Sequence, residues 1–392
     1  MRLEVVIPTI CGRERYLEWC IRSCLEQGEQ TRVLVSNNGG AESVRKLVSS
    51  FGDSRIRLVE PLSFLPMALH WEFAVEQAQE DILTIIGDDD ALVPGAAERV
   101  FNQFIMHPDI DCIAHQPAQY YWPDYPVHEM RDRLSCPTTD GTATVMPTKL
   151  VLKRVLEFKA WYGTLPVIYH GFVRRSALDR IRQLHGPLFK RLAPDVYADL
   201  LLATFLERFL VLSECLSVGG QGARSSGATF RLNPIEADQI VSELPESLKP
   251  VLSPKSITLQ IYEYGSMLQR FFPQDFIVVP SWWRFTANTF LEAVRYPDHR
   301  EEIMRDFRRL TREVLPPLTG FVARLLTSLA HFPPLMFGAM YLLKKRQQQQ
   351  ISEWEAVGAK RGVENVYAAA KYVYEESKNK HLVRQADCLT VT

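Results

Sequence analysis

The sequence has almost no net charge, since 45 basic and 46 acidic residues leave a formal charge of −1 at pH 7. Without an excess of lysine and arginine, there is no electrostatic case for binding nucleic acid. The chain also has no uninterrupted run of about eighteen apolar residues, the length that a membrane-spanning helix needs. We therefore expect neither a nucleic-acid-binding protein nor an integral membrane protein.

Cysteine pairs and a leader segment are also missing from the sequence. The seven cysteines contain no Cys-x-x-Cys pair, and their odd number argues against a disulfide framework. The N-terminal residues Met1-Arg2-Leu3-Glu4 run directly into a predicted strand, without the apolar segment of a secretory signal. Free thiols suit a reducing compartment, so we expect a cytoplasmic protein.

The first hundred residues show a regular alternation of short apolar strands and amphipathic helices. We expect strands over residues 4–8, 32–36, 55–60 and 81–87, and helices over residues 16–27, 42–51, 66–79 and 94–107. Strands and helices at this spacing predict an α/β fold, with a mostly parallel sheet covered by helices on both faces.

From about residue 111 onward, the sequence no longer shows this regular alternation of strands and helices. We expect one strand over residues 111–122, and a long irregular loop over the proline-rich and charged residues 123–149, of the kind that often serves as a lid. Helices are predicted over residues 150–158, 176–184, 198–209, 257–272, 281–294 and 301–314. We accordingly divide the chain into an α/β domain over residues 1–231 and a helical C-terminal region over residues 232–392.

The most informative motif is the triplet Asp88-Asp89-Asp90, which follows the apolar run of residues 82–87. If that run is a buried strand, the carboxylates lie at its carboxyl end, where α/β sheets bind ligands. Carboxylates so close together repel one another, and hard oxygen ligands select Mg²⁺ or Mn²⁺. The alternative is a solvated acidic turn that precedes a helix from Pro94. Spacing alone leaves both interpretations open.

Four segments in this order at strand ends resemble the family 2 (GT-A fold) nucleotide-sugar glycosyltransferases. They are Val5-Val6-Ile7-Pro8-Thr9 followed by Arg13, Val33-Leu34-Val35-Ser36-Asn37-Asn38-Gly39, His70-Trp71-Glu72, and Gly87-Asp88-Asp89-Asp90 ahead of Pro94. The resemblance covers about residues 3–230. It implies a GT-A domain that moves one sugar from a nucleoside diphosphate sugar to a hydroxyl of a saccharide or lipid-linked acceptor, most often with inversion, as in bacterial surface glycan assembly.

The resemblance also implies which residues bind the donor. Pro8 and Thr9 would cradle the nucleotide together with Arg13, and Asn37 would contact the base where relatives carry an aspartate. An ordinary turn is the alternative for Asn37, because asparagine and glycine tolerate turn conformations. Arg224, in a stretch rich in glycine and serine, would hold a phosphate with its forked guanidinium, unless that stretch is simply a flexible loop.

Within the acidic triplet, counting back from Pro94 as in relatives makes Asp89 the metal ligand. Asp90 would support the metal site, and Asp88 would approach the ribose or the metal. The register stays open, because Gly87 takes the first position of the family's Asp-x-Asp motif and Asp88-x-Asp90 is an alternative frame. A bound Mg²⁺ or Mn²⁺ would bridge the two donor phosphates and stabilise the charge on the leaving diphosphate.

Asp195 is the candidate catalytic base, because inverting relatives need a carboxylate that removes a proton from the acceptor hydroxyl. It matches the relatives' aspartate by following a proline, Pro194, at the start of an apolar helix. The alternative role for Asp195 is a helix N-cap, and Asp199 is the second candidate base. His170 resembles a family position too, and we favour a hydrogen-bonded structural histidine over a metal ligand.

Two other functions are kept as alternatives. A sugar nucleotidyltransferase has the same general fold, but only Cys11-Gly12-Arg13 stands where its glycine-rich loop would follow the first strand. A non-catalytic nucleotide-sugar-binding scaffold is favoured by Asn37 and Gly87, and opposed by Asp89 and Asp195.

The C-terminal region contains an apolar segment, residues 321–343, followed by Lys344-Lys345-Arg346. This pattern fits an amphipathic helix in a membrane interface. It also fits a buried helical hairpin, which we favour. Peripheral contact with the inner face of the membrane through residues 321–346 is therefore kept as an alternative.

Overall fold

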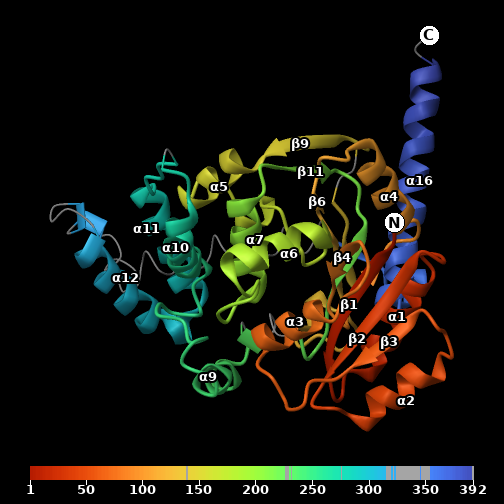
Figure 1. Ribbon diagram of the computed structural model, residues 1–392, viewed down its shortest axis with the longest axis horizontal. Helices are drawn as coiled ribbons and strands as arrows, with labels where there is room; N and C mark the ends of the chain where they lie inside the picture. The colour runs from red at the N-terminus through yellow and green to blue at the C-terminus, as the bar shows by residue number, and fades with distance from the viewer. Residues whose placement is uncertain are drawn as a thin grey trace.

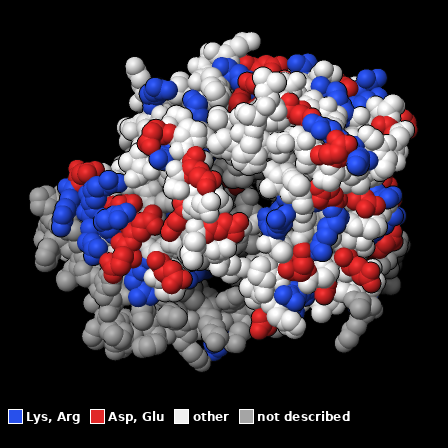
Figure 2. Space-filling view, turned by 90° about the horizontal axis from the view of Figure 1, so that it is seen from below, with Lys and Arg blue, Asp and Glu red and all other residues white. Residues whose placement is uncertain are grey.

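The computed structural model describes residues 1–137, 140–225, 229–230, 232–274, 276–314, 319–320, 322–323, 345 and 354–390. The apolar and basic segment, residues 321–346, for which we favour a buried hairpin over membrane contact, lies almost wholly outside these ranges. In the described part of the chain, no helix has the length and apolar character needed to cross a membrane. On the face shown in Figure 2, acidic and basic side chains are both present.

An eight-stranded mixed sheet lies at the centre of the α/β part (Figure 1). Its strand order is β3-β2-β1-β4-β10-β6-β11-β9, and β1 runs parallel to both β2 and β4. The strands are β1 (Leu3–Ile10), β2 (Thr31–Asn38), β3 (Ile56–Val59), β4 (Ile82–Ile85), β6 (Cys112–His115), β9 (Ala143–Pro147), β10 (Phe172–Arg174) and β11 (Arg208–Leu212). The parallel half of the sheet is the half that the sequence predicts best.

Helices cover both faces of this sheet because successive side chains of a strand point to opposite faces. Val5 of β1 belongs to the core that includes Leu17 of α1, whereas Val6 belongs to the core that includes Ala74 of α3. The helices of this part are α1 (Glu14–Leu25), α2 (Glu42–Ser50), α3 (Met67–Glu76), α4 (Ala96–Met106), α5 (Thr148–Leu156), α6 (Arg175–His185) and α7 (Pro194–Phe205). The predicted α/β class with helices on both faces is confirmed.

A second, five-stranded sheet has the order β13-β8-β7-β12-β5. Its strands are β5 (Ala91–Leu92), β7 (Ala118–Tyr121), β8 (Arg133–Ser135), β12 (Ser217–Gln221) and β13 (Glu355–Ala356). The prediction of one irregular loop over residues 123–149 is wrong, because β8 and β9 lie within it and join different sheets. β9 is an edge strand with mostly exposed side chains, so it lacks the apolar alternation that marks a strand in a sequence.

The single strand expected over residues 111–122 is two strands, β6 and β7, in different sheets. Gln116 and Pro117 separate them, and proline cannot donate to a sheet ladder. The helix expected over residues 198–209 begins earlier, at Pro194, and ends at Phe205.

The helices between residues 234 and 314 form a helical part. They are α9 (Pro234–Ser242), α10 (Ile257–Leu268), α11 (Trp282–Arg295) and α12 (Arg300–Val314). In this part α10 packs against α5 and α7, and α11 packs between α10 and α12 (Figure 1). Tyr264, Phe285 and Phe307 from this part are buried in the same core cluster as Leu152 of α5 and Tyr197 of α7.

The end of the described chain returns to the α/β part. It forms β13, α15 (Gly358–Arg361) and α16 (Val366–Thr390), and Figure 1 shows α16 beginning beside α1 and extending beyond the body of the molecule. Val366, Ala369 and Ala370 are buried there against the second sheet. The boundary predicted at residues 231/232 stays a prediction, but residues 354–373 pack with the N-terminal side of it.

Candidate functional site

The ends of three neighbouring strands bring the predicted donor residues together. Thr9 at the end of β1 is the parallel partner of Asn37 at the end of β2. On the other side of β1, the amide of Ile86 donates to the carbonyl of Val6 and leads β4 into the acidic triplet. Carboxyl ends of parallel strands thus form the edge of the sheet at which α/β proteins bind ligands.

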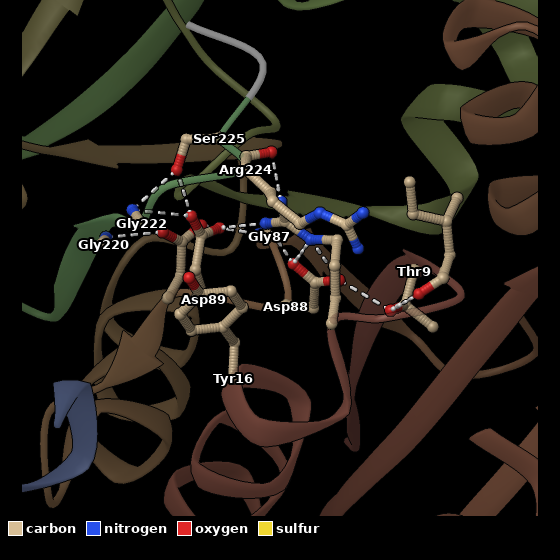
Figure 3. A network of polar contacts seen from close by, with 12 residues as sticks. Thr9, Tyr16, Gly87, Asp88, Asp89, Gly220, Gly222, Arg224 and Ser225 are labelled. Atoms are coloured by element: carbon tan, nitrogen blue, oxygen red, sulfur yellow. Dashed lines mark hydrogen bonds and ion pairs between the residues drawn. The ribbon is translucent and has the colours of Figure 1, made fainter. Parts of the chain in front are cut away.

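Asp88 is held by Arg13 and Thr9 (Figure 3). Nε of Arg13 lies 2.7 Å and 2.8 Å from the two carboxylate oxygens, Nη2 lies 2.6 Å from one of them, and the Thr9 hydroxyl donates a 2.6 Å hydrogen bond. The same Nη2 is 3.1 Å from Oδ1 of Asp89. Burial opposes the charge of this guanidinium, but Asp88 and Asp89 raise its pKa above the ordinary value. Arg13 is therefore a fixed positive charge between two carboxylates.

Asp89 accepts hydrogen bonds from the hydroxyl of Ser225 and, at 3.4 Å, from the amide of Gly222. Its backbone carbonyl accepts a 3.1 Å hydrogen bond from the indole of Trp122. Burial first, and then repulsion from the neighbouring carboxylates, raises the pKa of Asp89 to about 6 despite the opposing charge of Arg13. This side chain thus lies where negative charge is costly.

Asp90 is surrounded by hydrogen-bond donors, and they come from other residues than those that contact Asp88 and Asp89. Its oxygens accept hydrogen bonds from the Tyr169 hydroxyl and the Gly220 amide, both at 2.7 Å, and from the Gly87 amide at 2.5 Å. Nε2 of His170 lies 3.3 Å away. Burial raises the pKa of Asp90, but these partners, with His170 foremost, outweigh burial and lower it.

A glycine in β12 and the side chain of His170 support the arrangement of the acidic turn. A Cβ atom at residue 220 would lie 1.8 Å from the carbonyl oxygen of Asp89, so only glycine allows β12 to approach the acidic turn. His170 also places Nδ1 2.8 Å from the hydroxyl of Ser217. The histidine has the hydrogen-bonded structural role that the sequence favoured.

The three carboxylates were predicted to hold Mg²⁺ or Mn²⁺ through Asp89 and Asp90. Their combined charge suits a cation, because Arg13 alone opposes three acidic groups at the turn. Their geometry does not, since Arg13, Ser225 and the backbone amides already contact the oxygens that would bind the ion. Within the described ranges, no three His, Cys, Asp or Glu side chains are grouped to hold a metal. The cation stays a prediction.

Asn37 is buried, and its amide is used within the protein. The amide nitrogen donates to the carbonyl of Ala41 at 3.1 Å and to Glu60 at 2.5 Å, while its oxygen accepts from the amide of Ala41 at 3.2 Å. These contacts correspond to the turn alternative, and base contact by Asn37 stays a prediction. The exposed Phe64 lies beside this turn, where a Cβ at Gly39 would be 3.5 Å from its ring. No sequence pattern singles out this exposed aromatic side chain.

Arg224 lies over the loop that follows β1 (Figure 3). Its backbone carbonyl accepts from Arg13, and its guanidinium donates to the carbonyl of Gly12 at 3.3 Å. A Cβ at residue 12 would lie 2.2 Å from Nη1 of Arg224 and would displace this exposed guanidinium, and the φ of +82° at Gly12 also favours glycine. The exposed Arg224 side chain is thus brought to the donor edge of the sheet, next to Thr9 and Asp88.

Asp195 and Asp199 lie one turn apart on α7. Ala193 is the N-cap of this helix and no side chain caps it, so Asp195 lies in the first turn and does not have the capping role. Burial of its carboxyl group raises the pKa of Asp195. Asp199 is more deeply buried, its Oδ1 has no hydrogen-bond partner, and burial together with Asp195 raises its pKa well above the ordinary value.

Tyr169 connects α7 with the acidic turn. Burial raises its pKa, and the negative charges of Asp90, Asp89 and Asp195 raise it further. Tyr169 packs against the core cluster that includes Val196 and Tyr197 of α7, whereas Arg13 and Thr9 contact the triplet from the β1 side. The candidate base and the candidate donor contacts approach the triplet from different elements.

Comparisons with known proteins agree with this geometry. The model of the family described as Glycosyl transferase family 2 matches residues 4–181, which include the triplet but neither Asp195 nor Arg224. No curated protein matches the sequence.

Solved structures with a similar arrangement include Staphylococcus aureus TarS. One TarS structure matches with 14% identity and a TM-score of 0.44, over 84% of this chain and 53% of that one, so this chain spans about half the length of that protein. Another, of TarS residues 1–349 in complex with UDP-GlcNAc, matches with 13% identity and a TM-score of 0.45, over 96% of this chain and 92% of that one. Residues 4–181 thus match the model of glycosyl transferase family 2, and the α/β sheet with helices on both faces and the triplet at a strand end has the arrangement of the GT-A fold.

Proposed function

We propose that this chain transfers one sugar from a nucleoside diphosphate sugar to a hydroxyl group of a saccharide or lipid-linked acceptor, with inversion at the anomeric carbon. One observation carries the proposal. The acidic turn contacts a guanidinium, Arg13, through Asp88 and Asp89, and contacts Tyr169 through Asp90, and Tyr169 packs against the core cluster that includes residues of α7, the helix of Asp195. This arrangement supplies positive charge for a leaving diphosphate and a base for an acceptor.

The donor would bind along the ends of β1, β2 and β4. Thr9, Asn37 and Asp88 lie at these strand ends, and Pro8 precedes Thr9. Arg13 lies at the turn, where Asp88 and Asp89 hold its guanidinium, and the exposed Arg224 lies above it. Because negative charge develops on the diphosphate as its bond to the sugar breaks, fixed guanidinium groups stabilise the transition state more than the bound donor.

The acceptor would approach from the side of α7. Its hydroxyl gives a proton to Asp195 while its oxygen attacks the anomeric carbon and the bond from that carbon to the diphosphate breaks. The proton ends on Asp195, the bonding electrons leave with the diphosphate, and attack opposite the leaving group inverts the configuration. A raised pKa makes Asp195 a stronger base than an ordinary aspartate. No step in this scheme depends on a cation, although Asp89 and Asp90 would be its ligands.

A non-catalytic nucleotide-sugar-binding role is the second candidate. It is favoured by the complete pairing of the Asp88, Asp89 and Asp90 carboxylates within the protein. Such a protein would bind the donor without consuming it, so turnover separates the two functions.

The test is a panel of UDP, GDP, CDP and dTDP and their common sugar conjugates, measured by thermal unfolding with and without Mn²⁺. A ligand that binds only the folded state raises the melting temperature. We expect one nucleoside diphosphate to do so, and its sugar conjugate to be consumed when saccharide acceptors are added. Stabilisation without turnover would support the binding role. Release of pyrophosphate from a nucleoside triphosphate and a sugar phosphate would show a nucleotidyltransferase.

A further inference from the structure

The described C-terminal segment, residues 354–378, lies across the second sheet, and we call it the C-terminal strap. Its first residues extend that sheet, since Glu355 pairs with Leu134 and Ala356 with Arg133 in antiparallel register. The amide of Val357 then donates to the carbonyl of Asp132 at 2.9 Å. The strap is therefore joined to the sheet by backbone hydrogen bonds as well as by packing.

The strap buries an apolar face against the α/β part. Its buried side chains share one core with residues of α1, β5, β7 and β12, and they are Val357, Val363, Val366, Ala369, Ala370 and Val373. Polar and aromatic contacts also join α16 to α1 and its C-cap residue. Lys371 lies 3.3 Å from Glu26, and Tyr367 is stacked on Trp19 with ring centroids 6.1 Å apart. Small apolar residues at this spacing let α16 approach the sheet closely.

Two aromatic side chains of the second sheet lie between the strap and the acidic turn. The hydroxyl of Tyr120 donates to the carbonyl of Val363 at 3.3 Å. The ring of Trp122, two residues further on, contacts the ring of Tyr120 with centroids 5.9 Å apart, and its indole donates to the carbonyl of Asp89 at 3.1 Å. A continuous series of contacts thus runs from the C-terminal strap to Asp89.

The same sheet supplies the other constraints on the turn. β5 begins directly after the triplet, and β12 carries the Gly220 amide, which donates to Asp90. Without such constraints, repulsion among three buried carboxylates favours an open turn. The sheet that holds these groups together is completed by residues more than 250 positions further along the sequence.

We propose that the C-terminal strap is a functional part of the donor site, which it serves by positioning the acidic turn, and that Trp122 is the positioning residue between them. The consequence for donor binding rests on the proposed function, whereas the consequence for the turn itself does not. The C-terminal strap thereby makes the geometry of Asp89 depend on the end of the chain.

The first test replaces one hydrogen bond. Trp122→Phe keeps an aromatic ring beside Tyr16, whose ring lies 4.7 Å from that of Trp122, and removes the donor to Asp89. Trp283→Phe is the control, because this exposed indole lies on α11, outside both the second sheet and the C-terminal strap. Amide hydrogen exchange of Asp90 and Gly220 is measured in the unliganded protein. We expect exchange about twofold to tenfold faster in Trp122→Phe, as a lost hydrogen bond of ordinary strength implies, and unchanged exchange in the control. Unchanged exchange in folded Trp122→Phe would overturn the proposal.

The second test links the strap to the tryptophan. Val366→Ala loosens the buried face of α16, and its effect on the same amides is measured alone and combined with Trp122→Phe. If the strap acts through Trp122, the two effects are coupled and do not add. Strictly additive effects would overturn the role of Trp122.

UDP binding to the same variants is then measured by calorimetry, and we expect Trp122→Phe to weaken it several-fold. UDP affinity equal to that of the unaltered protein, despite faster exchange, would refute the link to the donor site. Failure of any nucleoside diphosphate to bind the unaltered protein would count against the proposed function and against that link, while the exchange data would still decide the positioning of the turn.

Discussion

The hydroxyl of Tyr169 donates a 2.7 Å hydrogen bond to Oδ2 of Asp90. The same ring is stacked on Trp71, with centroids 5.2 Å apart, so its orientation is fixed by packing as well as by the hydrogen bond. The negative charge of Asp195 acts on it from α7. The ring also packs against the core cluster that includes Val196 and Tyr197 of α7, the helix that carries the candidate base.

Tyr169→Phe should lower turnover by about tenfold, the usual scale for losing one hydrogen bond to a charged group, with little change in fold. The aromatic stack on Trp71 is kept, and only the donor to Asp90 is lost. Steady-state kinetics with the donor identified by thermal unfolding measure the effect. Tyr296→Phe, far along the helical part, is the control. Equal kinetics of both variants would show that the Tyr169 hydroxyl has no role in transfer.

Arg13→Met should destabilise the protein by about 3–5 kcal/mol at pH 7, because removing one partner of a buried ion pair leaves the other charge uncompensated. Urea unfolding measures the free energy. Arg15→Met is the matched control, since the exposed pair of Arg15 with Asp124 should be worth less than about 1 kcal/mol. Mn²⁺ should restore part of the stability of Arg13→Met, because the guanidinium no longer occupies Asp88 and Asp89. No greater effect of Mn²⁺ on this variant than on the unaltered protein would argue against a cation at these carboxylates.

Asp89→Asn should remove the cation-dependent part of donor binding. In the unaltered protein, we expect Mn²⁺ to raise the melting temperature only together with the nucleoside diphosphate, because the protein's own donors already contact the carboxylates and the phosphates must complete the ligand set. The variant should unfold at nearly the same temperature as the unaltered protein when no ligand is present. If Mn²⁺ adds the same stabilisation to donor-bound Asp89→Asn, Asp89 is not the metal ligand.

Asp195→Asn should keep donor affinity and lose turnover by about a hundredfold or more, as the loss of a general base predicts. Because burial raises the pKa of Asp195, and the base must be ionised, turnover of the unaltered protein should fall on acidification with a midpoint above the ordinary aspartate value of about 3.9. A pH profile of turnover measures this limb. Near-normal turnover in Asp195→Asn would move the role to Asp199 or to another group.

Asp199→Asn should stabilise the protein increasingly as pH rises. The folded-state pKa of Asp199 lies well above its unfolded value, so the folded state retains its proton longer, and stability of the unaltered protein declines from the unfolded pKa up to the folded one. Asparagine does not titrate and keeps an oxygen for the amide of Ile168. Melting temperatures of both proteins between about pH 4 and 8 test this. If the melting temperatures of the two proteins change with pH in the same way, the folded-state pKa of Asp199 is not raised.

Local patterns in the sequence were sufficient to predict the parallel half of the main sheet. The apolar runs of β1, β2 and β4 are short, buried and separated by amphipathic helices, so each run by itself indicates its structure. β9 could not be found in this way, because most of its side chains are exposed and its partner, β11, lies about sixty residues away. Edge strands are defined by their partner and carry little signal of their own.

The candidate site, like the main sheet, was predictable only where a local sequence pattern indicates the structure. The triplet and Thr9 come from strand ends, and parallel register brings them together. The contacts of Asp89 with Ser225 and Trp122 come from β12, β7 and the turns beside them, and nothing near these residues in the sequence indicates that they meet. Whether Asn37 serves a ligand or a turn likewise depends on Glu60, which only the fold brings within reach.

The order of strands in the second sheet has a consequence for how the protein is made. β5 and β7 leave the ribosome early, whereas β13 and α16, which cover their sheet, are among the last described residues to be synthesised. Contacts between such distant segments close slowly, since loop-closure entropy must be overcome first. Throughout translation, the nascent chain therefore carries an acidic turn without its final support. If the C-terminal strap positions the acidic turn as proposed, the turn reaches its final geometry only after that segment has docked, and a chain that stops early would lack this support.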